Sequence, residues 1–374
     1  MSDAESLPLP IPGGWCGALG LMVLKHLGRS VLLASLVLSA PWCAAETDSV
    51  PVPAPAAGVA ADGVPLEPVD RGLAALARLQ TPEGDFAEGP AVTALAGMAF
   101  LAGGSTATRG LYHEASARCL KAILAGQDRV TGYLADDTAH MYGHGFATLF
   151  LAESYGMAPA LPVRRALEAA LDLISYAQNQ DGGWRYDPAP SKADLSITIC
   201  QVMALRAAYN VGVGGDQVLA CMQRALAYVR RCANHNGSFR YQPEIDEEYG
   251  SGSPEGVGRT AAGCMCLIGM GVTDAADRTL GPGLVYLRRF CAAHLRTLEG
   301  YYWYSEYYAA QAMFHSPDPA DWTAYWSCAR PVILARQEPG GLWTQGEGPG
   351  PAYATAMALI ILQIPNNYLP IFER

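Results

Sequence analysis

The chain has 374 residues, a length typical of one large domain or two ordinary ones. Apolar residues make up 51% of it and charged residues 16%, so a large core can form and many helix surfaces must pack against other helices. Acidic residues outnumber basic ones, 35 to 25, and no run of lysine or arginine occurs, which argues against a nucleic-acid-binding role.

The N-terminus carries an export signature. Lys25 and Arg29 are positive, residues 31–40 form an apolar run, and Cys43-Ala44-Ala45 offers small residues for cleavage. Ten apolar residues are too few for a membrane span, which needs about 20. We therefore predict a signal-peptide region over 1–45, export to the periplasm or the extracellular space, and no transmembrane helix in the mature chain.

The next segment, residues 46–69, is rich in proline and alanine. Proline lacks a backbone donor and fixes its own φ, so this segment is predicted to be an extended linker. No further linker is evident from 70 to 374, which we predict to be one repeat domain.

Two kinds of predicted helix, which differ in composition, alternate along that domain. Amphipathic outer helices are predicted near 71–79, 112–125, 163–178, 216–232, 283–297 and 320–336. Inner helices, rich in small residues and apolar on all sides, are predicted near 90–102, 142–155, 194–209, 256–270, 304–314 and 351–363. Small side chains let helix axes approach closely, as a closed inner ring requires.

The turn inside each helical pair carries a recurring glycine, then any residue, then an aromatic. The copies are Gly84-Asp85-Phe86, Gly182-Gly183-Trp184, Gly237-Ser238-Phe239, Gly300-Tyr301-Tyr302 and Gly341-Leu342-Trp343, with Gly132-Tyr133-Leu134 as a degenerate one. Repeats about fifty residues long indicate a helical-hairpin array. Six such hairpins can close into a ring around a central cavity, with the aromatic wedged between neighbouring hairpins.

Eight cysteines follow the signal region: Cys119, Cys200, Cys221, Cys232, Cys264, Cys266, Cys291 and Cys328. Their spacing shows no paired metal knuckles, so most are predicted to be small core residues. Export leaves room for one or two disulfides.

The turn resembles the repeat of squalene and hopene cyclases and of protein prenyltransferase β-subunits. The copies that carry the resemblance are Gln180 to Trp184 and Gln337 to Trp343, with Gln80 and Phe86 as a looser one. The resemblance covers residues 70–374 and implies an all-α fold, a single α/α toroid (α6/α6 barrel) of six hairpins. This architecture also serves non-catalytic modules, so it implies the fold more firmly than an activity.

The string from 134 to 139 is similar to the acidic Asp-x-Asp-Asp-Thr-Ala motif of those cyclases. The resemblance implies Asp136 as the general acid that protonates a polyene, with Asp137 and His140 assisting it. Such an acid needs a raised pKa in a dry cavity. The alternative is an acidic pair that caps a helix N-terminus. Leu134 stands where the family has its first aspartate.

Prenyltransferases hold a zinc ion with aspartate, cysteine and histidine. At the matching positions this chain has Glu299, Tyr301 and Ala354, so we predict that the zinc site is lost and that no metal or other cofactor is bound. His140 and His144 have a spacing that can hold a metal, but the favoured role of His144 is a hydrogen-bonded residue at the rim.

The starts of the inner helices would meet at one mouth of the ring, where their partial positive charges suit an anionic group. Candidates for ligand contact there are Tyr142, His144, Arg259, Tyr308 and Tyr353. The alternative is that Arg259 pairs with a glutamate one turn earlier and the tyrosines fill the barrel.

Two function classes stay open. One is an exported, non-catalytic or divergent binding module for a hydrophobic or anionic ligand, with an isoprenoid lipid, a glycan or an envelope protein as its partner. The other is an isoprenoid-processing, cyclase-like enzyme that uses Asp136 as its acid.

Overall fold

The computed structural model describes residues 67–136, 139–244, 253–299 and 301–373. In it, the amphipathic and the small-residue helices alternate along the chain as outer and inner helices. The described residues belong to one of the two units into which the chain divides, residues 54–374. The predicted signal region and most of the predicted linker lie outside them. Helical structure begins at Glu67, three residues before the predicted start of the domain.

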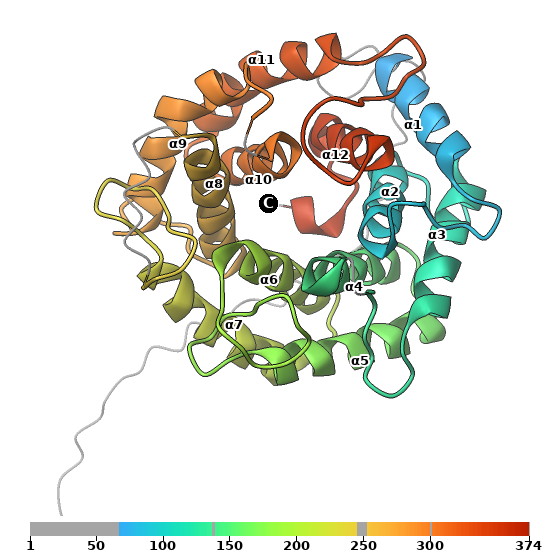
Figure 1. The fold of residues 1–374 in the computed structure, drawn as a ribbon, viewed down its shortest axis with the longest axis horizontal. Coiled ribbons are helices and arrows are strands. Elements are labelled where there is room, and N and C mark those ends of the chain that lie inside the picture. The colour runs from blue at the N-terminus through green and yellow to red at the C-terminus, as the bar shows by residue number, and fades with distance from the viewer. Residues whose placement is uncertain (1–66, 137–138, 245–252, 300, 374) are drawn as a thin grey trace, which may run out of the picture. The chain divides into compact units, whose positions relative to one another are not determined.

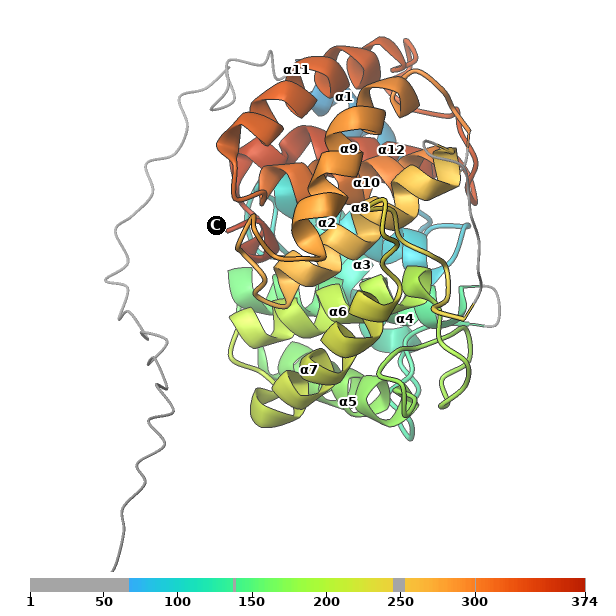
Figure 2. The ribbon, with the colours of Figure 1, turned by 90° about the vertical axis from the view of Figure 1, so that its left-hand side faces the viewer.

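The outer helices are α1 (Glu67–Leu79), α3 (His113–Gly126), α5 (Leu161–Ala177), α7 (Gly215–Arg231), α9 (Leu280–His294) and α11 (Pro319–Ala335). The inner helices are α2 (Pro90–Ala102), α4 (His140–Met157), α6 (Leu195–Asn210), α8 (Pro254–Gly269), α10 (Tyr302–Phe314) and α12 (Pro351–Gln363). The described residues contain no β-strand. Figure 1 shows the even-numbered helices as an inner ring inside the odd-numbered ones, and Figure 2 shows the same layers from the side. The last inner helix packs on the first, α12 on α2, so the predicted α/α toroid of six hairpins is confirmed.

Residue size explains which helices lie inside. Every residue of α2 from Val92 to Ala102 is buried, and a side chain at Gly97 would come within 2.4 Å of the Phe150 ring on α4. The outer helix α5 instead buries one stripe that includes Leu167 and Ile174 and exposes an Arg164–Glu168 ion pair. Helices rich in small residues can therefore pack closely together and form the inner ring, and amphipathic helices cover that ring.

A glutamine just after the outer helix joins four of the six hairpins to the next, and the buried one is Gln178 after α5. The Gln178 amide nitrogen donates to the Gly182 carbonyl at 2.8 Å and to the Cys221 carbonyl of α7 at 2.9 Å. Its amide oxygen accepts from the Arg224 guanidinium at 2.7 Å. Gln180, which begins the turn motif quoted for the family resemblance, is exposed, and Gln178 makes these contacts.

The same glutamine staple recurs at other hairpin boundaries. Gln80 donates to the Ala115 carbonyl of α3, and Gln127 donates to the Ala166 carbonyl of α5. Gln337, just after α11, donates to the Pro68 carbonyl at 2.7 Å and accepts from Arg71 at 2.9 Å, both on α1. The last staple therefore joins the two ends of the repeat array and closes the ring.

The turn aromatics Trp184 and Trp343 are buried, and Trp343 also lies against Gly72 on α1 of the next hairpin, as predicted. Each indole N–H donates at 2.7 Å to a carbonyl of the outer helix before it, that of Ile174 or Ile333. The backbone N–H of each tryptophan donates to a threonine on the inner helix that follows. The turn therefore fixes the angle between the two helices of its hairpin.

Glycine is required at the turn position that meets the next hairpin. Gly341 has φ +95°, and a side-chain carbon there would lie 2.5 Å from the Arg71 carbonyl oxygen. We expect Gly341→Ala to lower the free energy of unfolding by about 2 to 3 kcal/mol, from backbone strain and a clash with a carbonyl that cannot move. Gly340→Ala is the matched control, since nothing lies within 4 Å of that position. Urea unfolding of both variants tests this, and equal midpoints would contradict it.

The C-terminal segment turns back into the centre of the ring (Figure 1). Two 3-10 helices, η1 (Ile364–Asn366) and η2 (Pro370–Phe372), follow α12, and η2 packs against α4 and α6. The Ile371 N–H donates at 3.2 Å to the Glu153 carboxylate of α4. Ile371 and Phe372 are buried, so this segment fills part of the interior.

The cysteines after the signal region are all free thiols. All of them except Cys328 are buried, in agreement with their prediction as core residues.

Candidate functional site

Neighbouring inner helices run in the same direction and bring their first turns to one end of the ring. Gly145 near the start of α4 faces Cys200 of α6, and Gly258 near the start of α8 faces Ser305 of α10. Most residues deeper in these helices are buried. Half-buried side chains in the first turns are Tyr142 on α4, Ser196 on α6, Tyr304 on α10 and Tyr353 on α12.

Five tyrosines meet around Cys200, and we call them the tyrosine cluster: Tyr142, Tyr304, Tyr307, Tyr308 and Tyr353. The Tyr308 hydroxyl lies 3.4 Å from the Cys200 sulfur. The Tyr308 ring lies edge-on to the rings of Tyr304 and Tyr307, with centroids 4.8 and 4.9 Å apart. Edge-to-face packing of this kind is favourable for aromatic rings and leaves their hydroxyls to reach polar groups.

The tyrosines of the cluster are uncharged at neutral pH, and burial disfavours their ionisation further. Burial raises the pKa of Tyr142 and that of Tyr308 well above their ordinary value, and nearby tyrosines and Cys200 add to the effect. Burial also raises the pKa of the Cys200 thiol to about 12, so this cysteine is not a thiolate nucleophile at neutral pH. The cluster can therefore offer aromatic faces and neutral hydroxyl groups.

A polar group borders the cluster at the mouth, and we call it the rim network: Arg185, Tyr186, Asp194 and Tyr241. The Tyr186 and Tyr241 hydroxyls are 2.8 Å apart, and the Arg185 guanidinium lies over both rings, 5.1 and 5.9 Å from their centroids. The Tyr186 ring lies 6.2 Å from that of Tyr142, which joins the rim network to the cluster.

Asp194 is the fully buried carboxyl of the rim network. It caps α6 by accepting from the Ile197 N–H at 2.8 Å, and Arg185 lies 3.8 Å from its other oxygen. Burial raises the pKa of Asp194, and the hydrogen bond from Ile197 opposes that rise. The rim network therefore contains an arginine and a carboxyl group of opposite charge, Arg185 and Asp194, beside two aromatic rings.

The acidic string lies at the same end of the ring. Asp136 is exposed, and its carboxylate accepts at 2.8 Å from the Ala139 N–H just before α4. Asp137 lies outside the described residues. His140, the first residue of α4, is half-buried with φ +50°, and its ring lies edge-on to Tyr186 at 6.0 Å. Asp136 thus accepts a hydrogen bond from the residue before α4, in an environment open to water.

His144 points away from the mouth. It is fully buried, its Nδ1 accepts from the Leu134 N–H at 3.2 Å, and its Nε2 lies 3.2 Å from the Ala170 carbonyl of α5. Burial lowers the pKa of His144 to about 4, so the ring is neutral. Both nitrogens are engaged by backbone groups, and His144 ties the segment before α4 to the outer ring.

The structure thus brings together some of the residues singled out in the sequence and separates others. Tyr142, Tyr308 and Tyr353 share the surroundings of Cys200, whereas His144 lies between α4 and α5. Arg259 is half-buried in the second turn of α8. Among the described residues, no three or more His, Cys, Asp or Glu side chains are grouped closely enough to hold a metal ion.

The sequence analysis did not predict the rim network, although a sequence pattern marks two of its tyrosines. Two consecutive turns continue past the aromatic with arginine and tyrosine, as Trp184-Arg185-Tyr186 and Phe239-Arg240-Tyr241. The shared pattern places Tyr186 and Tyr241 at equivalent points of adjacent hairpins, which is why their hydroxyls meet.

Comparison with solved structures finds the same architecture in enzymes of two kinds. The type II terpene cyclase MstE from Scytonema is 16% identical with a TM-score of 0.51, over 81% of this chain and 99% of its own. Cellobiose 2-epimerase from Bacillus thermoamylovorans is 11% identical with a TM-score of 0.58, over 80% and 98% of the two chains. D-mannose isomerase is 12% identical with a TM-score of 0.53, over 79% and 96%.

These likenesses show the toroid fold and no more. No protein-family model matches the chain, and a search of curated proteins finds no match. Within the described part of the chain, every helix is too short or too polar to cross a membrane.

Proposed function

We propose that the chain is an exported binding module that takes an isoprenoid-like molecule, apolar with a polar or anionic head, at the mouth where the inner helices begin. The observation that carries this proposal is the tyrosine cluster, in which three inner helices present half-buried or buried uncharged rings around one point. Aromatic faces suit an unsaturated hydrocarbon chain. Glycans and envelope proteins are the other partners that such a mouth could take.

The charges at the mouth favour a polar head there. Arg185 is 31% exposed at its side chain and is balanced by Asp194. The helix N-termini and Arg259 add positive charge to that end of the ring. A head group that accepts hydrogen bonds would lie at the rim network, with the chain on the tyrosine cluster. The terpene cyclase MstE, in a variant form, has been solved with geranylgeranyl dihydroxybenzoate as substrate, a molecule of this general design.

The second candidate is an isoprenoid-processing enzyme with Asp136, Asp137 and His140 as its acid group. It is supported by the contact of His140 with Tyr186 of the rim network. The exposure of Asp136 weighs against it, because protonating an alkene requires a carboxylic acid held in a dry site. We therefore favour the binding module over the enzyme.

Geranylgeraniol is the probe that tests both candidates. We expect it to bind the wild-type chain, and we expect Tyr142→Ala or Tyr353→Ala to raise its Kd about tenfold, equivalent to about 1.4 kcal/mol. Tyr176→Ala is the control, because Tyr176 is 65% exposed on the outer helix α5. Fluorescence titration measures the four Kd values.

Equal affinity in Tyr142→Ala and Tyr176→Ala would contradict the proposed site. Native mass spectrometry of protein from its own envelope would show a retained lipid if the proposed ligand class is correct. Conversion of geranylgeraniol to a cyclic product would favour the enzyme.

A further inference from the structure

The boundary between α9 and α11 differs from the four joints of the outer ring that use a glutamine. No glutamine staple joins these helices. Instead the Arg336 guanidinium donates to the Leu295 and Thr297 carbonyls at 3.0 and 3.1 Å. About two helical turns before Leu295, Arg288 forms a two-point ion pair with Asp321 of α11, at 2.5 and 2.8 Å. The two helices are therefore held at both ends of their contact and not in the middle.

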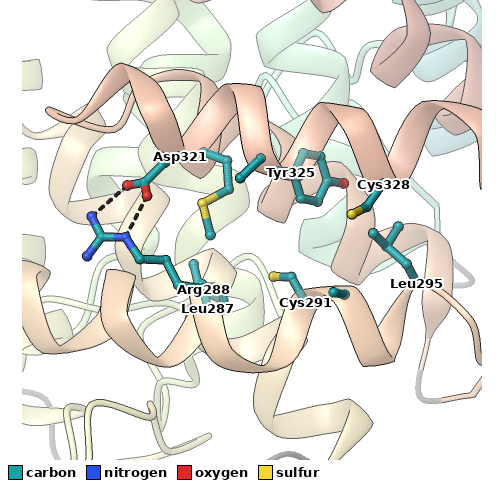
Figure 3. Close-up of a pocket in the computed structure, with 10 residues that line it drawn as sticks. Leu287, Arg288, Cys291, Leu295, Asp321, Tyr325 and Cys328 are labelled. Carbon is teal, nitrogen blue, oxygen red and sulfur yellow. Dashed lines mark hydrogen bonds and ion pairs between the residues drawn. The ribbon is translucent and has the colours of Figure 1, made fainter.

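A pocket of about 170 Å³ occupies that middle (Figure 3). Its floor consists of the buried side chains of Leu287, Cys291, Leu295, Met313 and Tyr325. The small exposed residues Ala292 and Ala324 form its opening, next to Cys328. The pocket is thus apolar inside, and alanines leave it open to solvent.

The polar groups around the pocket already have partners. The Tyr325 hydroxyl donates to the Glu306 carboxylate at 2.7 Å, and the other oxygen of that carboxylate lies 2.7 Å from His294 Nδ1. Tyr325 therefore presents its ring to the pocket. Asp321 is paired with Arg288 and also accepts from the Ser316 hydroxyl at 2.5 Å. Burial raises the pKa of the Cys291 thiol well above its ordinary value, so the sulfur is neutral.

We infer that this pocket is a second binding site, for a small uncharged apolar group such as the end of a hydrocarbon chain. An apolar cavity of about 150 Å³ in another protein binds benzene or xenon, so the volume here suffices for a group of that size. A charged ligand would have to break the Arg288–Asp321 pair, and the polar groups of the floor have nothing left to offer it. The site lies in the outer ring and shares no residue with the tyrosine cluster or the rim network.

Occupancy would join α9 to α11, a boundary that lacks the glutamine found at four other boundaries. The ligand would touch Leu287 and Cys291 from one helix and Tyr325 from the other. Binding should therefore stabilise this part of the ring, since a ligand that binds only the folded form raises its stability.

Benzene is the probe, and its Kd for the full chain is measured by ligand-observed NMR. We expect wild-type protein to bind benzene, and we expect Ala292→Leu combined with Ala324→Leu to weaken binding at least tenfold by filling the opening. Both positions are exposed, so the variant should fold. Ala293→Leu is the control, because Ala293 is exposed on α9 and does not line the pocket. Benzene should also slow the alkylation of Cys328 in wild-type protein.

Absence of benzene binding to the wild type would overturn the inference. Equal binding to the filled variant and to Ala293→Leu would overturn it as well, because the ligand would then lie elsewhere. Neither result bears on geranylgeraniol binding at the mouth, since the tyrosine cluster is unchanged in all three proteins.

Discussion

The Glu153→Gln variant is expected to be more stable than the wild type by several kcal/mol above pH 8, and by much less at pH 5. Glu153 lies on α4, is fully buried, and accepts one hydrogen bond from the Ile371 N–H of the C-terminal segment. Burial raises the pKa of Glu153 from 4.5 to about 8, opposed by that hydrogen bond. A glutamine keeps an oxygen acceptor for Ile371 and never carries the charge.

The direction of this pH dependence follows from the pKa of Glu153, which is 4.5 in the unfolded chain and about 8 in the folded chain. Below pH 4.5 the carboxyl is protonated whether the chain is folded or not, and its burial costs little. Between pH 4.5 and about 8 the unfolded chain releases the proton and the folded chain keeps it, so stability falls as pH rises. The slope is at most about 1.4 kcal/mol per pH unit and ends above pH 8.

His144 adds the opposite slope at lower pH. Its pKa falls from 6.5 to about 4 on folding, so the unfolded chain takes up a proton first and stability is lost as pH falls through that range. The two slopes oppose each other between pH 4.5 and 6.5. Between about pH 6.5 and 8, the fall in stability caused by Glu153 is therefore not opposed by His144.

Urea unfolding from pH 5 to 9 tests this expectation. Glu168→Gln is the matched control, because Glu168 is exposed on α5 and its neutralisation should not tilt the profile. Parallel stability profiles for Glu153→Gln and the wild type between pH 6.5 and 8 would show that the carboxyl is not buried in the folded protein. Limited proteolysis at pH 9 should release the C-terminal segment faster from the wild type than from Glu153→Gln.

The helices could be predicted from the sequence because their causes are local. Small residues around all faces of α2 and a single apolar stripe on α5 separate inner from outer helices without knowledge of their partners. The glutamine staple was not predicted, since two glutamines precede the turn at Trp184 and only the contact with α7 shows that Gln178 is the one that joins the hairpins. The closed ring followed from the number and texture of the hairpins.

The candidate site was predicted only in part because its contacts join distant parts of the chain. Tyr142, Tyr308 and Tyr353 were found from their places in inner helices. Cys200 was read as a core cysteine, and its contact with Tyr308 spans 108 residues. Glu153 lies in a smooth apolar helix, and its role depends on a C-terminal segment that returns to the centre of the ring. Neither pairing leaves a periodic signal in the sequence.

Replacing Gln337 by leucine is expected to cost as much stability as the same change at a staple in the middle of the array, about 2 to 3 kcal/mol. Gln337 gives hydrogen bonds to the Pro68 and Gly341 carbonyls and accepts one from Arg71. Gln178 makes the matching contacts with Cys221, Gly182 and Arg224. Leucine would leave two carbonyls and one guanidinium without these partners at either place.

The comparison discriminates a closed ring from an open array. In an open array Gln337 would be a surface residue of the last repeat, and its substitution would cost less than about 0.5 kcal/mol. Gln180→Leu is the control for a glutamine that makes no staple. Chemical denaturation of the three variants under one condition measures the differences. A cost at Gln178 without a cost at Gln337 would mean that α11 does not meet α1 in solution, and the mouth formed by the inner helices would lose the closure on which the proposed site depends.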